Sequence, residues 1–168
     1  MRSMIRKRLP VLAAALLLAA LAAHPAAAQS ADAVVGTWLT EAGDKGGAAR
    51  VEIAREDGDF VGRIVWLEEP DFVDGEHAGE PKRDLENPDE ALRDRPILDL
   101  AILDGFSYAG KGTWSGGKIY DPANGKTYKA KMYLDGDGDR TLEIRGYVGI
   151  TLFGRTTTWT RVEAESGN

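Results

Sequence analysis

The sequence contains no cysteine and only two histidines, and its acidic residues outnumber its basic residues. The absence of cysteine excludes disulfide bonds, thiol nucleophiles, thiolate zinc sites and iron–sulfur clusters. A formal net charge of −6 argues against nucleic-acid binding, which needs a basic surface, so we expect no nucleic-acid partner. The length of 168 residues favours one domain over two.

Residues 1–28 have the pattern of a secretory signal peptide. Four basic residues precede an apolar run over residues 11–23, and Ala26, Ala27 and Ala28 form a small-residue cleavage site. The apolar run is shorter than the roughly 20 residues needed to span a bilayer. We therefore expect cleavage, no membrane span afterwards, and a protein that is exported to the periplasm or secreted.

The segment expected after cleavage, residues 29–168, is strongly acidic. It retains 17 basic and 27 acidic residues, which gives a net charge of −10. This charge favours solubility and disfavours binding to anionic lipid surfaces or nucleic acid. Because the segment would enter an oxidising compartment without cysteine, its stability must come from a packed core, for which about 140 residues suffice.

Three segments alternate apolar and polar residues, at 49–53, 128–134 and 142–148. Since successive side chains of a strand point to opposite faces, this pattern predicts strands with one buried face. Clusters of Asp, Asn, Gly and Pro between the segments are typical of turns. Weaker strand candidates lie at residues 34–40, 60–67, 102–108, 112–120 and 155–162.

Seven or eight consecutive strands joined mainly by short turns describe an antiparallel meander. Such a sheet removes its exposed edges by closing into a barrel. We therefore predict an all-β fold, a single antiparallel up-and-down barrel of about eight strands, over residues 29–168.

One long loop, residues 68–99, interrupts the predicted strands. It holds 12 acidic and four basic residues, and loops of this length are often functional. A short helix is predicted inside it, with Asn87 as its cap and Pro88 at the first helical position. Arg93 then falls near the carboxyl end of this helix, where a cation is favoured.

Two features resemble the barrels of the lipocalin type. Gly36 and Trp38 form a G-x-W sequence on the first predicted strand, and Arg161 lies on the last one. In that resemblance, the arginine packs across the tryptophan and closes the barrel floor. The implied cation–π contact contributes about 0.5–2 kcal/mol.

A second resemblance extends from about Val35 to Arg161. It rests on ordered sequence blocks: GRIVWL at 62–67, NPD at 87–89, LRDRP at 92–96, WSGGKIYDP at 114–122, GKTY at 125–128, RGYVG at 145–149 and GRT at 154–156. Together these blocks resemble the exported bacterial family known as domain of unknown function 2147. The resemblance implies a small secreted or periplasmic β-barrel without an established activity.

Aromatic residues on the predicted strands suggest a ligand site. If they face inward, they line a cavity with an apolar wall and a few polar groups, as ligand sites do. The alternative is that they fill the barrel, since an eight-stranded barrel is either solid or holds one small ligand. On the first reading the barrel binds a small apolar or amphipathic molecule. The candidate ligand-binding residues are Trp66, Trp114, Tyr120, Tyr128, Arg145 and Tyr147.

Two other functions stay open. The acidic loop, residues 68–99, would serve an envelope protein partner, with Arg93 and Arg95 paired to neighbouring carboxylates such as Asp84 and Glu86. The two arginines would otherwise recognise an anionic ligand by bidentate hydrogen bonds. A hydrolase is the least supported reading, because no nucleophile and base stand together. We therefore expect a binding protein and not an enzyme.

No pattern predicts a metal or cofactor. His77 lies among polar residues with Glu76 and Glu80 beside it, which is a weak basis for a metal site. The acidic segment 135–139 resembles the start of a calcium loop, but the required glycine at position six and glutamate at position twelve are missing.

Overall fold

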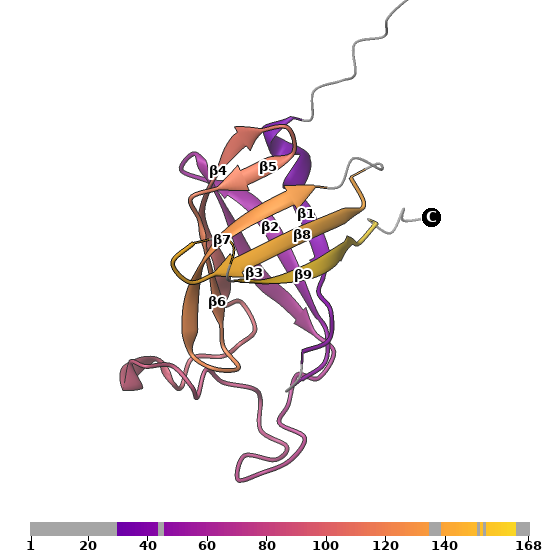
Figure 1. Ribbon diagram of the computed structural model, residues 1–168. Coiled ribbons are helices and arrows are strands. Elements are labelled where there is room, and N and C mark those ends of the chain that lie inside the picture. The colour runs from indigo at the N-terminus through magenta and orange to yellow at the C-terminus, as the bar shows by residue number, and fades with distance from the viewer. Residues whose placement is uncertain (1–29, 44–45, 135–138, 151, 153, 164–168) are drawn as a thin grey trace, which may run out of the picture.

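The computed structural model describes residues 30–43, 46–134, 139–150, 152 and 154–163. The predicted signal peptide, residues 1–28, lies outside this set, as does most of the acidic segment 135–139. The described residues form two short 3₁₀ helices and nine strands, and the nine strands belong to one antiparallel sheet (Figure 1). The strands are β1 (Gly36–Leu39), β2 (Ala49–Glu56), β3 (Asp59–Leu67), β4 (Ala101–Gly110), β5 (Thr113–Ser115), β6 (Lys118–Asp121), β7 (Lys126–Leu134), β8 (Thr141–Tyr147) and β9 (Gly154–Arg161).

The sheet closes on itself as an up-and-down barrel. Strands β1 to β4 pair in sequence, and β1 also pairs with β9, which continues through β8 to β7. Both β5 and β6 pair with β4 on one side and with β7 on the other, so they share one position. The result is an eight-position antiparallel meander, which confirms the predicted fold class.

The strand predicted over residues 112–120 is divided into β5 and β6. Gly116 has φ +84° and interrupts the extended backbone. At Gly117, a Cβ atom would lie 2.4 Å from the ring of Phe106, so only glycine fits against this core side chain. The break therefore serves packing of the barrel interior, which residue alternation alone does not reveal.

The inward positions of the barrel are occupied by large side chains. Space left by a glycine is also used: a Cβ on Gly62 would lie 2.8 Å from the side chain of Leu103. The strand glycine thus makes room for core packing, as expected of a well-packed interior. The largest fully buried hydrophobic side chains are Trp38, Trp114, Phe60, Phe106, Ile53, Leu103, Met132, Leu142 and Ile144.

One end of the barrel is closed by the 3₁₀ helix η1 (Ala31–Val34), at the top of Figure 1. Two buried tryptophans donate their indole N–H groups to carbonyl oxygens of this helix. Trp38 Nε1 lies 2.9 Å from the oxygen of Val34, and Trp114 Nε1 lies 3.0 Å from the oxygen of Ala31. The helix therefore satisfies both buried donors while it covers the core.

Arg161 fastens this closed end, as the lipocalin resemblance implies. Its guanidinium carbon lies 4.2 Å from the centre of the Trp38 ring. Its N–H groups donate to the carbonyl oxygens of Ala33, Val35 and Asp139. Burial lowers the pKa of Arg161 from its ordinary value.

Gly36 is required beside this arginine for two reasons. Its φ of +130° is a conformation that favours glycine, and a Cβ there would lie 2.9 Å from Nη1 of Arg161. The G-x-W sequence therefore places a backbone without a side chain under the guanidinium and the tryptophan under its face.

The long loop lies at the opposite end of the barrel, at the bottom of Figure 1. It connects β3 to β4 and contains η2 (Glu90–Leu92). The predicted helix exists there as this single 3₁₀ turn. Among the described residues, no helix is long and apolar enough to cross a membrane.

The predicted cap of this helix is wrong. Asp89, not Asn87, caps η2, with its carboxylate accepting from the backbone N–H of Ala91 at 3.0 Å. Asn87 is buried, and its side-chain oxygen accepts from the backbone N–H of Asp89. Pro88 consequently precedes the cap and does not occupy the first helical position. Arg93 does follow the helix directly, and its N–H bonds the carbonyl of Glu90.

Candidate functional site

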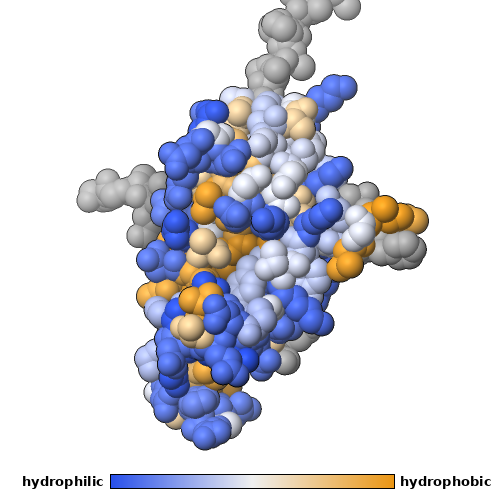
Figure 2. All heavy atoms as spheres, turned by 90° about the vertical axis from the view of Figure 1, so that its left-hand side faces the viewer, coloured by the Kyte–Doolittle hydropathy of each residue, from blue (hydrophilic) through white to orange (hydrophobic). Residues whose placement is uncertain are grey.

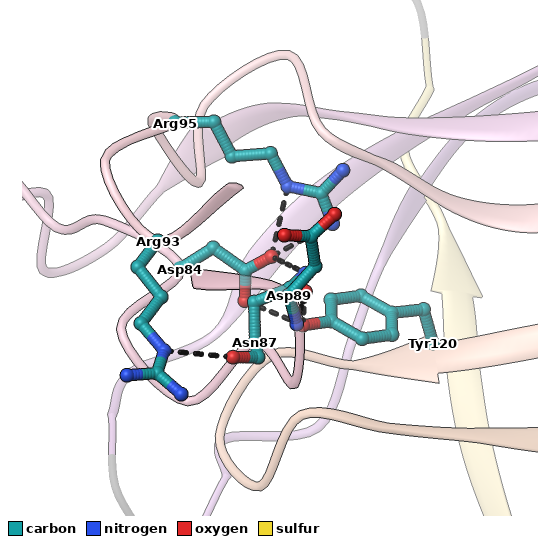
Figure 3. A network of polar contacts seen from close by, with 6 residues as sticks. All are labelled: Asp84, Asn87, Asp89, Arg93, Arg95 and Tyr120. Carbon is teal, nitrogen blue, oxygen red and sulfur yellow. Dashed lines mark hydrogen bonds and ion pairs between the residues drawn. The ribbon is translucent and has the colours of Figure 1, made fainter. Parts of the chain in front are cut away.

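A fully buried carboxylate, Asp84, organises the loop end of the barrel (Figure 3). Its Oδ1 accepts the hydroxyl of Tyr120 at 2.6 Å. Its Oδ2 accepts Nδ2 of Asn87 at 2.7 Å and two nitrogens of Arg95, Nε at 2.8 Å and Nη2 at 2.7 Å. A buried charge is costly unless it is paired and hydrogen-bonded, and here both oxygens are engaged.

This Asp84 network joins the loop to the barrel wall. Asp84, Asn87 and Arg95 belong to the loop, whereas Tyr120 belongs to β6. The guanidinium of Arg95 also lies 5.5 Å from the centre of the Tyr120 ring. Burial raises the pKa of Tyr120, and the hydrogen bond to Asp84 and its negative charge raise it further.

The turn between β6 and β7 packs directly on this network. Gly125 has φ +68°, and a Cβ there would lie 1.8 Å from the carbonyl oxygen of Glu86. No side chain fits in that position. The backbone of the loop and the backbone of the turn are therefore in van der Waals contact at Gly125.

The two loop arginines pair locally. Arg95 pairs with Asp84, one of the neighbouring carboxylates considered from the sequence. Arg93 does not reach Glu86; its Nε donates to the carbonyl of Asn87 at 2.8 Å, and its Nη1 lies 3.4 Å from Glu90. Both side chains are thus used to hold the loop in shape.

An apolar groove of about 490 Å³ lies between the end of β3 and the loop. Strand β3 forms one wall and three loop prolines form much of the other. The polar groups at the groove are Lys82 and Asp71. The complete lining is Val65, Trp66, Leu67, Pro70, Asp71, Pro81, Lys82, Pro96 and Leu98.

Trp66 reaches this groove because of a β-bulge. The pairing register of β2 and β3 slips between Arg50 and Val51, so Val65 is an extra residue in β3. Simple alternation from the buried Ile64 would place Trp66 inside the barrel. The bulge instead places it on the outer face beside Arg50, whose guanidinium lies 4.9 Å from its ring centre.

Lys82 is the cation at the groove. Its side chain is 15% exposed, and Nζ lies 3.3 Å from Oε2 of Glu69. The backbone N–H of Lys82 donates to the carbonyl of Pro70, which aligns two parts of the loop on the groove wall. An amphipathic molecule in the groove would find a positive charge at this edge.

A second cavity, of about 350 Å³, lies beside the Asp84 network. It is more polar than the groove, since its lining includes Asn87, Arg95, Tyr120 and the outward residues Asp104 and Lys118. Pro88, predicted to organise the loop, lines this cavity too.

The six predicted ligand residues are not brought together. Trp66 lines the groove and Tyr120 the second cavity. Trp114 is fully buried in the core against Tyr108, with ring centres 5.1 Å apart. The remaining three lie elsewhere on β7 and β8: Tyr128 accepts from Asn124, Arg145 bonds Thr156 and Leu152, and Tyr147 lies at the end of β8.

The reasoning from sequence missed the residues that shape these cavities. Asp84 was one of 12 acidic residues in its loop, and nothing in the sequence marks it as buried. The position of the three loop prolines at the groove and the bulge at Val65 depend on tertiary contacts, which the sequence does not show. The sequence feature nearest to the Asp84 network was the density of arginine and acidic residues in 92–96.

His77 is held within the loop. Its Nδ1 lies 3.3 Å from Oε2 of Glu80 and 3.4 Å from Nη2 of Arg83. Across the part of the chain that the structure describes, no group of three or more His, Asp or Glu side chains is placed to bind a metal ion.

The sequence model of the bacterial family described as "Uncharacterized protein conserved in bacteria (DUF2147)" matches residues 36–161. The chain belongs to this family. Four of the sequence blocks that carry the resemblance meet in this DUF2147 protein at the Asp84 network: they supply Asn87, Arg95, Tyr120 and Gly125.

A solved structure resembles this DUF2147 barrel closely. It is protein HP1028 from Helicobacter pylori, described as belonging to the lipocalin family. The TM-score is 0.67 at 25% sequence identity, and the match covers 79% of this chain and 84% of the other. The lipocalin-like barrel predicted from the G-x-W sequence is thereby confirmed. Among curated proteins, no relative matches the chain.

Proposed function

We propose that this DUF2147 protein is an exported binding protein that holds a small apolar or amphipathic molecule in the groove between β3 and the loop. The observation that carries the proposal is the outward turn of Trp66 into an apolar groove. Trp66 is 38% exposed, and covering its ring with a ligand contributes favourable binding free energy. Export rests on the predicted cleavage after residue 28.

The groove suits a ligand with an apolar body and a polar or acidic head. Its volume of about 490 Å³ lies within the range of small-molecule sites, about 300–1,000 Å³. The apolar body would lie on Trp66 and the loop prolines. The head would lie near Lys82, where it would replace the partly exposed Glu69 as the partner of Nζ.

The proposed position differs from the barrel interior considered on sequence grounds. Large side chains occupy the inward positions, which supports a site beside the barrel instead of within it. The Asp84 network would then have a supporting role, because Arg95 immediately precedes the groove residue Pro96. A fixed loop presents a preformed wall and lowers the ordering cost of binding.

A binding role without catalysis accords with the chemistry of the buried groups. Asp84 is the buried carboxylate among the described residues, and both of its oxygens accept hydrogen bonds from protein groups. Such a carboxylate is unavailable to activate water or a substrate. A hydrolase is therefore not favoured.

A native mass spectrum of the protein from its own cells tests occupancy first. An added mass that leaves on denaturation is expected, and the mass of the chain itself will show whether it begins at residue 29. The bare chain alone, even at high protein concentration, would count against a carrier function.

Substitution of Trp66 by alanine tests the position of the site. We expect W66A to weaken binding of a fluorescent amphipathic probe, anilinonaphthalene sulfonate, about tenfold, because a buried aromatic contact is lost. Y147A is the comparison, since Tyr147 was predicted to bind the ligand but lies on β8, away from the groove. Loss of binding in Y147A together with normal binding in W66A would contradict the groove.

The alternative is an envelope protein partner for the acidic loop. It is favoured by the exposure of apolar Val73, 72% exposed, and Leu98, 51% exposed, on this loop. A V73S variant separates the two functions, because Val73 does not line the groove. Loss of partner capture with unchanged probe binding would support the interaction module.

A further inference from the structure

Like charges stand directly opposite one another on the outer face of β6, β7 and β8. Lys118 on β6 pairs in register with Lys129 on β7, and Lys131 on β7 pairs with Arg145 on β8. Lys129 and Lys131 point outward, because the adjacent Ala130 and Met132 are fully buried, and Lys118 and Arg145 stand opposite them in register. Like charges opposite each other destabilise a sheet, so the arrangement is costly for the fold alone. We call Lys118, Lys129, Lys131 and Arg145 the basic strip.

The ion pairs of the described residues do not include the lysines of the strip. Arg145 donates to the hydroxyl of Thr156 at 3.0 Å and to the carbonyl of Leu152 at 3.2 Å. Carboxylates stand at its margins, with Asp104 opposite Lys118 and Glu143 two residues from Arg145.

An apolar projection adjoins the basic strip. The connection from β8 to β9 exposes Val148 at 70%, Ile150 at 60% and Leu152 at 73%. We call these three residues the apolar tip; Figure 2 shows hydrophobic surface projecting at the right-hand edge of the molecule. Arg145 links the two features, because it belongs to the strip and bonds the backbone of Leu152 in the tip.

We propose that this face docks on the surface of a lipid bilayer that contains anionic lipids. Projecting aliphatic side chains insert at the boundary between headgroups and acyl chains, and neighbouring lysines bind the anionic headgroups. The positive charge of the strip is complementary to anionic headgroups, and the projecting side chains of the tip suit a deformable surface.

The net acidity of the protein does not oppose this docking. Charges separated by more than a Debye length, about 8 Å at physiological salt, are largely screened. Lys118 lies at the loop end of the barrel, where it lines the second cavity with Asn87 and Arg95, whereas the other three basic residues lie on the outer wall of β7 and β8. Docking at this face would therefore not follow the net charge, because four basic side chains occur together there.

Flotation with vesicles tests the proposal. The wild-type protein, in the form the bacterial cell produces, is mixed with vesicles of equal parts phosphatidylglycerol and phosphatidylethanolamine, or of phosphatidylcholine alone. We expect binding to the anionic vesicles, weaker binding at high salt, and little binding to phosphatidylcholine. No binding of the wild-type protein to the anionic vesicles overturns the proposal.

Matched variants test each component. Loss of the three strip lysines in K118Q/K129Q/K131Q should weaken binding about fivefold per lysine. The control R55Q/R63Q/R140Q removes the same charge from other exposed positions and should bind almost normally. Equal losses of binding in the two variants would show an effect of net charge and would overturn the specific role of the strip lysines.

The tip is tested by V148S/I150S/L152S, which should weaken binding about tenfold or more. The control V73S changes a side chain of similar exposure, 72%, on the acidic loop. Unchanged binding of the tip variant to anionic vesicles overturns the insertion of the tip. Since neither the strip nor the tip lines the groove, these outcomes are independent of the small-molecule proposal.

Discussion

At the scale of single residues, Asp84 decides how the loop end of the barrel is built. Its carboxylate is fully buried and accepts from three side chains that come from two separate parts of the chain. A residue of this kind stabilises the correct arrangement and strongly destabilises arrangements that leave it unpaired. Arg161 has the matching position at the closed end, where it joins the last strand to η1.

Replacement of Asp84 by asparagine should lower the free energy of unfolding by about 2 kcal/mol, because hydrogen bonds to a charged group are lost. Urea unfolding measures this loss. D94N is the control, since Asp94 is 90% exposed and bonds Arg83 at the surface. The control should lose less than about 1 kcal/mol. Equal losses in D84N and D94N would contradict the importance we assign to burial.

At the scale of elements, strand prediction succeeded where burial alternates and failed where pairing interrupts it. The alternation in 128–134 and 142–148 was enough to predict β7 and β8, because one face of each strand is buried. The direction of Trp66 was not predictable, since the bulge at Val65 arises from the register with β2. Nor was the break at Gly117, which exists for the ring of Phe106.

For the short helix, the element was predicted correctly but its cap was not. The sequence 87–90 contains good capping residues, and a helical turn does form there. Tertiary contacts then compete for the side chains: Asn87 is taken by Asp84 and Tyr120, so Asp89 becomes the cap. Local propensity predicted the helix, whereas the hydrogen bonds of the Asp84 network determine which residue caps it.

A pair of glycine variants isolates the contact between the loop and the β6–β7 turn. Gly125 and Gly58 both have positive φ, but a Cβ at Gly58 meets nothing within 4 Å. G58A should therefore lose only the conformational cost, about 1 kcal/mol. G125A should lose about 3 kcal/mol or more, because its Cβ also meets the carbonyl of Glu86. Similar losses in urea unfolding would contradict a tight contact at Gly125.

At the scale of the whole molecule, different functions are assigned to different faces of one barrel. One end is closed by η1, the other carries the loop and both cavities, and the outer wall carries the basic strip and the apolar tip. The total charge does not describe this division. The sequence patterns predicted export and a barrel, and the composition predicted an acidic surface, but neither predicted how the charges are separated over it.

The stability of the molecule should depend on Tyr120 in alkaline solution. The pKa of Tyr120 is raised in the folded protein, so the folded state retains the phenol proton where the unfolded state loses it. This stabilisation is complete below the unfolded pKa, about 10, and is lost as the pH rises through the folded value. Above about pH 10, the unfolding free energy should fall more steeply for the wild type than for Y120F. Parallel pH profiles would show that Tyr120 does not titrate with unfolding.

The closure of the barrel by Arg161 also has a consequence for how fast this protein acquires its structure. Arg161 bonds Ala33 and Val35, which precede it by 128 and 126 residues, and β9 pairs with β1. Contacts of such high sequence separation make folding slow, because the chain entropy is lost before the contacts form. The barrel cannot close until its last strand has been made. If the chain is exported as proposed, slow closure of the barrel would keep it unfolded while it passes through a translocation channel.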